Sequence, residues 1–399
     1  MRSLSLAVAG LAATLASAGL PAQAQRAAEP IRGVQAVALD LPRIRLNLSR
    51  TPGGPQLAPI DEDGGRGIDA FLDTGASGVL LPASASDAMK LARARTATGV
   101  DVQFEDVGVA GSERFWVSEP LHFSVTPFGS GAAAASGQRG GPIRLQVRSG
   151  GESALAGGFA VAGMPVMAGR VVVIDTAPLA HLETLRTTLH RPGDPTIPRA
   201  AHQVPLTYVS FDRFTRTHPA GAVSPTLEKN PVIGPSPLDP ASRVRSVVLR
   251  RGANTALVTL LLDTGASSSF VSTRVAKKLG VKPGEDGGIV GERPERQFSL
   301  TLGGIGGTRD APGFHVDRVE LPTRDGAALV FADSPFLIND VRATGPDGAE
   351  FELEGVLGMN YLCPSARLED ALGDGAAAGP FRQIVIDHAA GFLGLVPAR

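Results

Sequence analysis

Hydrophobic residues along the chain form short runs that are interrupted by turn-forming residues. Residues 68–72 and 258–262 are apolar runs of strand length. Residues 37–48 and 204–211 are also strand-like, and each such segment stands near the start of one half of the chain. The pattern therefore predicts many short strands.

Helix signals are few and short. In the second half, Ser272 can cap a helix that carries Val275 and Leu279 on one face and is left at Gly280. In the first half, Ser86 can cap a weaker helix. The 49 glycines and 31 prolines add frequent turn signals, so we predict an all-β protein with short helices.

Length and composition set the scale of this fold. The 399 residues, 43% of them hydrophobic, can bury a large core. At ~150 residues per domain, the length predicts two or three domains. The net charge of -1 excludes a general electrostatic attraction to nucleic acid or to acidic membrane.

Metal and disulfide signals are missing from the sequence. Cys363 is the single cysteine, which excludes a disulfide framework and a cysteine-based zinc site. The seven histidines have no metal-binding spacing, and residues 61–64 lack the rest of a calcium loop, so an acidic turn is expected there. We expect neither a metal nor a cofactor.

The N-terminus has the form of an export signal. Arg2 is followed by an uncharged run rich in leucine and alanine that ends in a small-x-small site at Ala24. A transmembrane anchor is the alternative, but Gly10, Gly19 and Pro21 break the run and no basic flank follows. We predict a signal peptide over residues 1–24, no membrane attachment after its cleavage, and a periplasmic or secreted protein.

One pentapeptide occurs twice, about half the chain apart. Asp-Thr-Gly-Ala-Ser stands at residues 73–77 and again at 263–267, each time after an apolar strand. Two further segments repeat in the same order. These are Val-Ala-Gly-Met and Val-Leu-Gly-Met at residues 161–164 and 356–359, and Val-Val-Ile-Asp and Ile-Val-Ile-Asp at residues 172–175 and 384–387.

The repeats predict two homologous β-rich lobes. We expect the first lobe over residues 25–190 and the second over residues 246–399. Residues 191–245 are rich in proline and are interpreted as a linker and insertion that includes the first strand of the second lobe.

The repeated Asp-Thr-Gly motif can carry chemistry. A carboxylate at the end of a buried strand is costly unless it is compensated. A threonine hydroxyl can bond backbone across an interface, and a glycine lets backbone N–H groups approach the carboxylate. If a pseudo-twofold axis relates the lobes, Asp73 and Asp263 meet ~3 Å apart and share one proton.

Such a pair supplies a base and an acid at one point. The base takes a proton from water that attacks a peptide carbonyl, and the acid protonates the carbonyl oxygen. The alternative is that each motif is only a strand-to-turn element whose aspartate bonds local backbone.

These motifs, with the apolar-apolar-glycine elements that end at Gly163 and Gly358, resemble the aspartic protease superfamily in its two-lobed, single-chain form with retropepsin-like motifs. The resemblance covers most of residues 35–399 outside the proline-rich segment, and the second lobe is the closer match. It implies a bilobal acid-protease fold in which the apolar-apolar-glycine strands pass beneath the aspartate loops.

The resemblance also implies roles for individual residues. Asp73 and Asp263 would be catalytic, and Thr74 and Thr264 would interlock the lobes. Supporting positions in the two motifs are Gly75, Ser77, Gly265 and Ser267.

A glycine-rich segment resembles the flap of retroviral-type enzymes. Gly304 and Gly306 flank Ile305 and can form a mobile hairpin tip over an extended peptide. The first lobe offers a similar segment around Val109, without the flap tyrosine of pepsin-like enzymes. A plain hairpin turn is the alternative for the glycine-rich segment, and which lobe covers the cleft stays open.

The residue after each motif glycine is alanine, at Ala76 and Ala266. A serine or threonine there would donate a hydrogen bond to the carboxylate and favour its ionised form. We therefore expect activity at milder pH than that of a gastric-type enzyme.

Taken together, the sequence predicts an exported bacterial aspartic endopeptidase, a hydrolase that is active as a monomer. Its substrate would be a peptide or protein bound in extended conformation between the lobes. The alternatives are a catalytically inactive peptide-binding protein with the same bilobal cleft, and a β-rich envelope scaffold in which the repeat is purely architectural.

Overall fold

The computed structural model describes most of the chain from residue 30 onward. The described ranges are 30–58, 67–96, 99–129, 138–148, 160–181, 183–211, 216–219, 237–284, 288–290, 293–345, 348–363 and 380–398. The predicted signal peptide, the acidic turn at residues 61–64 and residues 220–236 of the proline-rich segment lie outside the described residues.

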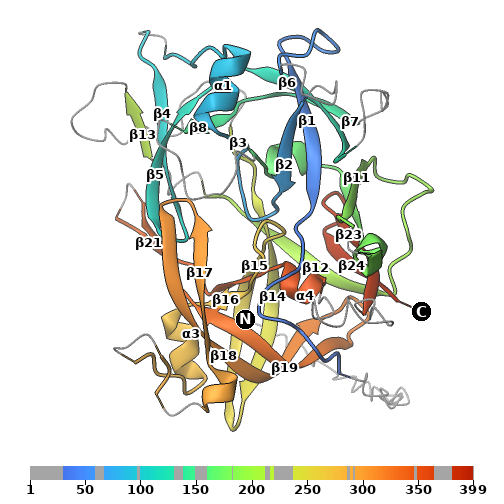
Figure 1. The fold of residues 1–399 in the computed structure, drawn as a ribbon, viewed down its shortest axis with the longest axis vertical. Coiled ribbons are helices and arrows are strands. Elements are labelled where there is room, and N and C mark those ends of the chain that lie inside the picture. Colours follow the sequence, from blue (N-terminus) through green and yellow to red (C-terminus); the bar gives the residue numbers. More distant parts are fainter. Residues whose placement is uncertain are drawn as a thin grey trace, which may run out of the picture.

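Two large sheets make up the described structure (Figure 1). The ten-stranded sheet has the order β13-β4-β5-β8-β3-β9-β2-β1-β6-β7. Its strands are β1 (Arg43–Ser49), β2 (Ile68–Leu72), β3 (Leu80–Leu81), β4 (Val102–Gly108), β5 (Gly111–Val117), β6 (Leu121–Pro127), β7 (Gln138–Ile143), β8 (Gln146–Arg148), β9 (Ala160–Ala162) and β13 (Arg216–Pro219).

The twelve-stranded sheet has the order β11-β10-β23-β24-β12-β14-β15-β22-β16-β19-β18-β17. Its strands are β10 (Val171–Asp175), β11 (Arg186–His190), β12 (His202–Val209), β14 (Ala241–Arg251), β15 (Asn254–Leu262), β16 (Phe270–Val271), β17 (Phe298–Gly304), β18 (Gly307–Pro322), β19 (Ala328–Ile338), β22 (Gly355–Leu357), β23 (Phe381–Asp387) and β24 (Phe392–Pro397). A separate pair is formed by β20 (Arg342–Thr344) and β21 (Glu350–Glu352).

The described helices are short. They are α1 (Ala83–Met89), α2 (Met164–Met167), α3 (Thr273–Lys278), α4 (Met359–Leu362) and the 3-10 turns η2 (Ala177–His181) and η4 (Pro294–Arg296). Ser272 caps α3, because its Oγ accepts a hydrogen bond from the backbone N–H of Val275 at 3.3 Å. The predicted cap at Ser86 is wrong, since α1 begins earlier and Ser86 lies buried inside it.

The two halves repeat one topology. In the first, β2 pairs in parallel with β9 and β3 pairs in parallel with β8. In the second, β15 pairs in parallel with β22 and β16 pairs in parallel with β19. The all-β, bilobal fold class predicted from the sequence is therefore confirmed.

Strands from both halves of the chain share one sheet. β10 pairs antiparallel with β23, so that Val173 lies opposite Val385, and β24 pairs with β12. β12 lies within the predicted linker segment and pairs with β14. The predicted lobe limits stay predictions, because strands from both sides of residue 190 contribute to this sheet.

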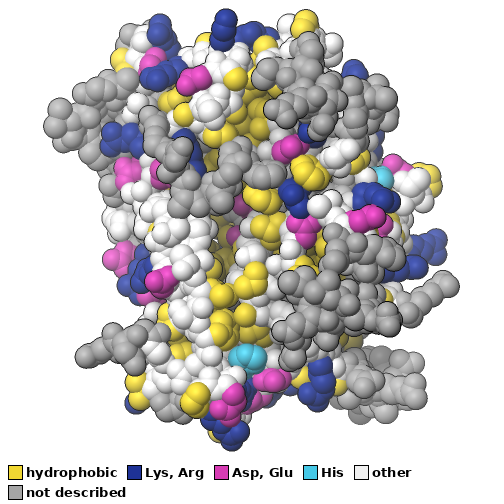
Figure 2. Space-filling model, viewed as in Figure 1, with side chains coloured by type: hydrophobic (Ala, Val, Ile, Leu, Met, Phe, Trp, Pro, Cys, Tyr) yellow, Lys and Arg dark blue, Asp and Glu magenta, His cyan; other side chains and the backbone are white. Residues whose placement is uncertain are grey.

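The core is continuous between the halves. Leu72, Ile174, Leu262 and Ile386 belong to one cluster of buried apolar side chains. On the face shown in Figure 2, hydrophobic side chains lie along the middle and most charged ones lie nearer the edges. In the described ranges, no helix has the length and apolar character needed to span a membrane.

Candidate active site

Each repeated aspartate follows a buried strand and sits above a second, parallel strand. Asp73 follows β2, and its backbone N–H donates to Ala162 O at 3.1 Å. Asp263 follows β15, and its N–H donates to Leu357 O at 3.0 Å. The apolar-apolar-glycine strands β9 and β22 therefore run beneath the aspartate loops, as the resemblance implied.

Backbone N–H groups orient both carboxyls in the same way. In the first lobe, Gly75 and Ala76 donate to Asp73 Oδ1 at 2.8 and 2.9 Å. The equivalent amides of the second lobe donate to Asp263 Oδ1, both at 2.9 Å. One oxygen of each carboxyl is thus held by its own loop.

Two buried threonines connect the loops. Thr74 Oγ1 donates to Leu262 O at 2.7 Å and accepts from Thr264 N at 3.2 Å. Thr264 Oγ1 donates to Leu72 O at 2.5 Å and accepts from Thr74 N at 3.2 Å. Both threonines are fully buried, so these four bonds join the two halves in a dry interface.

The motif glycines bring the carboxyls together. A Cβ added at Gly75 would lie 2.7 Å from Asp263 Cγ, and one added at Gly265 would lie 2.5 Å from Asp73 Cγ. Each glycine therefore packs on the carboxyl of the opposite half, where a side chain would not fit. The carboxyls of Asp73 and Asp263 lie in hydrogen-bonding contact.

Burial and mutual repulsion change the acidity of this pair. Burial raises the pKa of Asp73 above its ordinary value, although hydrogen bonds from Asp263 and the loop amides oppose the shift. The pKa of Asp263 is raised well above its ordinary value by burial, by the negative charge of Asp73 and by the hydrogen bond between them. The two carboxyls therefore titrate as a coupled pair, in which Asp263 is the group whose ionisation is more strongly opposed.

The pair lies at an apolar cavity of about 270 Å³. Asp73, Asp263 and Asp106 are the charged residues among those described along its wall. Most other lining side chains are hydrophobic. They include Phe71, Val107, Val161, Phe211, Leu261, Ile305, Val341, Phe351 and Val356.

Two hairpins, one from each half, meet over this cavity. The β4–β5 tip touches the β17–β18 tip, and Ala110 N donates to Ile305 O at 3.2 Å. A Cβ added at Gly304 would lie 3.0 Å from Val109 Cγ2, and Asn339 Nδ2 donates to Val109 O at 3.3 Å. Both lobes therefore supply a hairpin, which answers the question that the sequence left open.

Comparison with known families places this geometry in context. Residues 252–361 match the family model described as "Aspartyl protease". The match spans Asp263, the β17–β18 hairpin and the strand beneath the aspartate loop, and it confirms the recognition of the superfamily made from the repeated motifs.

Solved structures show weaker likenesses over most of the chain. An aspartic proteinase from Irpex lacteus is 14% identical, with 90% of this chain and 96% of that chain covered and a TM-score of 0.36. Basic 7S globulin from soybean is 9% identical, with 90% and 97% covered and a TM-score of 0.40. Conglutin gamma from lupine seeds is also 9% identical, with 90% and 95% covered and a TM-score of 0.40. These TM-scores are too low to carry an argument, and no curated protein matches the sequence.

The serines of the two repeated Asp-Thr-Gly-Ala-Ser segments differ in position. Ser77 lines the cavity, and its buried hydroxyl has no hydrogen-bond partner among the described residues. Ser267 does not line the cavity, and its backbone carbonyl accepts a hydrogen bond from Ala38 N at 2.8 Å. Their supporting roles stay predictions.

Two residues of the site, Asp106 and Phe211, were not predicted from the sequence. Asp106 comes from β4 and Phe211 from the segment after β12, and both line the cavity. The spacing of Asp106 from Gly108 at the hairpin tip is the one sequence signal that could have placed it near the site. Phe211 carries no such signal, because its segment reaches the cavity only through the packing of the halves.

Proposed function

We propose that the protein is an aspartic endopeptidase that hydrolyses peptide bonds with a water activated between Asp73 and Asp263. The observation that carries this proposal is the contact of two carboxyls that derive from equivalent loops and differ in acidity. The match of residues 252–361 to an aspartyl protease model supports the same class of chemistry.

The steps follow from the two protonation states. Asp73, as the charged partner, accepts a proton from water while the water oxygen attacks the peptide carbonyl carbon. Asp263 donates its proton to the carbonyl oxygen, which gives a neutral tetrahedral diol. Transfer of a proton to the amide nitrogen then lets the C–N bond break and releases a carboxylic acid and an amine.

The proposed substrate is a peptide or protein in extended conformation. The hairpin edges on either side of the cavity offer backbone groups to such a chain, and the apolar wall suits hydrophobic side chains. Because one chain supplies both carboxyls, we propose a monomer. The predicted signal peptide supports a periplasmic or secreted location, without membrane attachment after cleavage and without a nucleic-acid partner.

A catalytically inactive peptide-binding protein is the second candidate. Contact between the two hairpin tips favours it, because a closed cover slows the exchange of substrate and product. In that case the cleft would hold a peptide without cleaving it.

Casein cleavage separates these candidates. We expect residues 25–399, purified without the signal peptide, to cleave casein, and a pepstatin-type inhibitor to abolish the cleavage. Stable binding of casein peptides without new termini would support the inactive binder instead. If the protein neither binds nor cleaves casein peptides, only an architectural role would be left for the repeat.

A further inference from the structure

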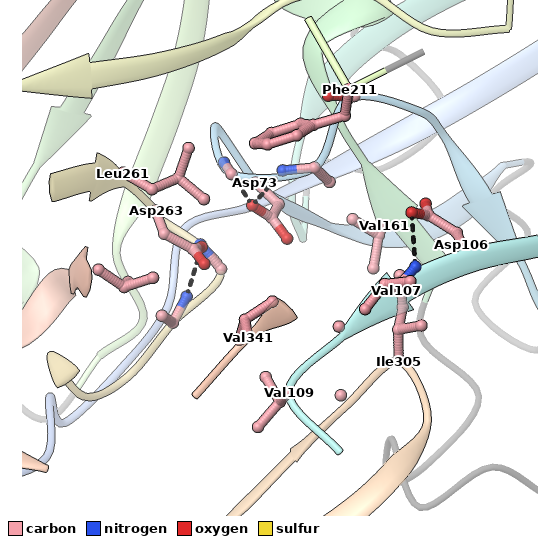
Figure 3. A pocket seen from close by; sticks show the side chains of 18 of the residues that line it. Asp73, Asp106, Val107, Val109, Val161, Phe211, Leu261, Asp263, Ile305 and Val341 are labelled. Carbon is pink, nitrogen blue, oxygen red and sulfur yellow. Dashed lines mark hydrogen bonds between the residues drawn. The ribbon is translucent and has the colours of Figure 1, made fainter. Parts of the chain in front are cut away.

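The cavity wall contains a third carboxyl that the proposed reaction does not use. Asp106 lies on β4, two residues before the closing pair of the hairpin, and its Oδ1 accepts a hydrogen bond from Val107 N at 2.8 Å (Figure 3). Among the described residues, no lysine, arginine or histidine pairs with it. The neighbouring acid Glu113 is already paired, with Arg148 Nε at 3.1 Å.

Two more polar groups at this place lack partners. Gln146, from β8, is fully buried, and beyond its contact with the Asp106 carboxyl neither its side-chain oxygen nor its nitrogen has a hydrogen-bond partner within the described structure. Its amide lies close enough to Asp106 to lower the pKa of that carboxyl. A Cβ added at Gly78, which lines the cavity, would lie 2.5 Å from Gln146 Oε1.

Ser77 completes this group, since its buried hydroxyl is also unpaired. We call Asp106, Gln146 and Ser77 the polar corner. Buried polar groups without full hydrogen bonding cost free energy, so the Gln146 amide and the Ser77 hydroxyl, beside a carboxylate without a cationic partner in the described structure, need an explanation. A ligand group that donates hydrogen bonds could reach the Asp106 carboxylate and the Ser77 hydroxyl, which both line the cavity.

The acid and the amide of the polar corner have no polar counterparts in the other half, whereas Ser77 corresponds to Ser267. Asp106 stands two residues before the closing pair Gly108–Gly111 of its hairpin, and Leu302 stands two residues before the closing pair Gly304–Gly307. Gln146 pairs with Leu80 just as Leu337 pairs with Phe270. The repeated fold therefore accepts leucine at both positions, which means that the acid and the amide are not required by the architecture.

We infer that the polar corner is a subsite for a lysine or arginine side chain of the substrate, while the equivalent subsite of the second half takes an apolar side chain. This inference rests on the proposed endopeptidase function. An ammonium or guanidinium group there would pair with the Asp106 carboxylate at the cavity wall, next to the Ser77 hydroxyl, while the buried Gln146 amide contacts that carboxyl. The aliphatic stem of either side chain would pack on the apolar cavity wall.

The acidity of Asp106 fits this role. Burial raises its pKa to about 6, so the carboxyl is mainly ionised at pH 7, and no cationic side chain of the described residues neutralises it. A buried charge without a counter-ion costs free energy. A bound cation offsets this cost, whereas an apolar side chain leaves the charge without a partner.

Matched peptides test the inference. Three peptides would carry lysine, norleucine or leucine at one position next to the scissile bond, and kcat/KM would be measured for each, with the position placed on either side of the bond in turn. At one of the two positions we expect lysine to exceed norleucine by about tenfold or more. Asp106→Leu, which copies Leu302 of the second half, should remove this ratio, and Asp106→Asn should reduce it.

Asp310→Asn is the matched control, because this exposed carboxyl lies on the other hairpin outside the cavity. It should keep the lysine preference. Cleavage of the leucine peptide by Asp106→Leu reports that the variant is folded. Equal cleavage of the three peptides, or a lysine preference that survives in Asp106→Leu, would overturn the inference while leaving the endopeptidase intact. Absence of all cleavage in the wild type would instead contradict the proposed function.

Discussion

Asp73 and Asp263 have identical neighbours in sequence, and their difference in acidity arises only where they meet. Each receives two backbone N–H bonds, and neither receives a side-chain hydroxyl from the following residue, which is alanine in both motifs. Burial raises both pKa values, and the charge of Asp73 adds to the rise at Asp263. One proton between two like groups is the result.

The pH profile of cleavage follows from this pair. Activity needs Asp73 ionised and Asp263 protonated, and both pKa values are raised. Activity should therefore decline on the acid side as Asp73 gains a proton and on the basic side as Asp263 loses its own. We expect an optimum above about pH 3, on a scale where free aspartate titrates near 3.9. A profile of kcat/KM that peaks below about pH 3 would contradict this account.

The motif threonines should contribute to stability rather than to chemistry. Thr74→Val removes the bond to Leu262 O and leaves Thr264 N without its acceptor. We expect a loss of about 1–3 kcal/mol in the free energy of unfolding, because both groups stay buried. Thr74→Ser keeps the hydroxyl and is the control. Urea unfolding measures both variants, and equal stability of the valine and serine variants would rule out this role.

Many of the individual site residues could be predicted from the sequence. The repeated pentapeptide predicted the two carboxyls and the threonine contact between lobes, because two equivalent strand ends can share one site if the lobes are related by a pseudo-twofold axis. The polar corner was not predictable. Asp106 and Gln146 are far apart in sequence, and only the pairing of β8 with β5 and β3 brings the Gln146 amide next to the Asp106 carboxyl.

At the scale of elements, the two hairpins over the cavity are the main feature of the candidate site. The glycines around Ile305 predicted a tip in the second half, and the segment around Val109 predicted a weaker one in the first. Their contact could not be predicted, because it depends on the distance between the halves and on strand lengths that no local pattern specifies. The structure brings both tips over the same cavity.

Gly306 should control this contact. It has a φ of +88°, and an added Cβ would lie 2.5 Å from Gly111 N of the opposite tip. Gly306→Ala should push the tips apart and raise KM by about fivefold, which corresponds to roughly 1 kcal/mol. Gly307→Ala is the control, because its φ of +111° carries similar strain but an added Cβ meets nothing within 4 Å. Steady-state kinetics with one peptide would measure KM for both variants. Equal KM values would show that the contact between the tips does not affect substrate binding.

At the scale of the molecule, one sheet and one core join the halves. The repeats predicted two lobes of equivalent topology. They did not predict that the segments ending at Asp175 and Asp387 pair with each other, because register between strands so distant in sequence is set by the assembled fold. His388 lies at this junction. Its backbone N–H donates to Arg170 O at 3.0 Å, and its backbone carbonyl accepts from Tyr208 Oη at 3.0 Å.

His388 should make stability depend on pH. Burial lowers its pKa to about 4, from about 6.5 in an unfolded chain. The folded state therefore keeps the ring neutral, and the stability that this contributes is present above about pH 6.5 and lost as pH falls toward 4. The loss should amount to about 3 kcal/mol.

His388→Phe removes this titration and keeps the ring volume. We expect the difference in unfolding free energy between pH 7 and pH 4.5 to shrink in the variant, as measured by urea unfolding at both values. Other titrating groups are shared by both proteins and cancel in the comparison. An unchanged difference would mean that His388 is protonated in the folded state.

The most direct measurement of the central claim compares cleavage of a peptide library by Asp73→Asn, Asp263→Asn and the double variant. Asp175→Asn and Asp387→Asn are the matched controls, because these repeated aspartates also end strands and accept bonds from local backbone N–H groups. We predict that each single change at the pair lowers kcat/KM by about 10³-fold or more, that the double change costs no more than either, and that both controls stay active. Loss of cleavage in only one of the two single variants, or cleavage that persists in both, would contradict the account.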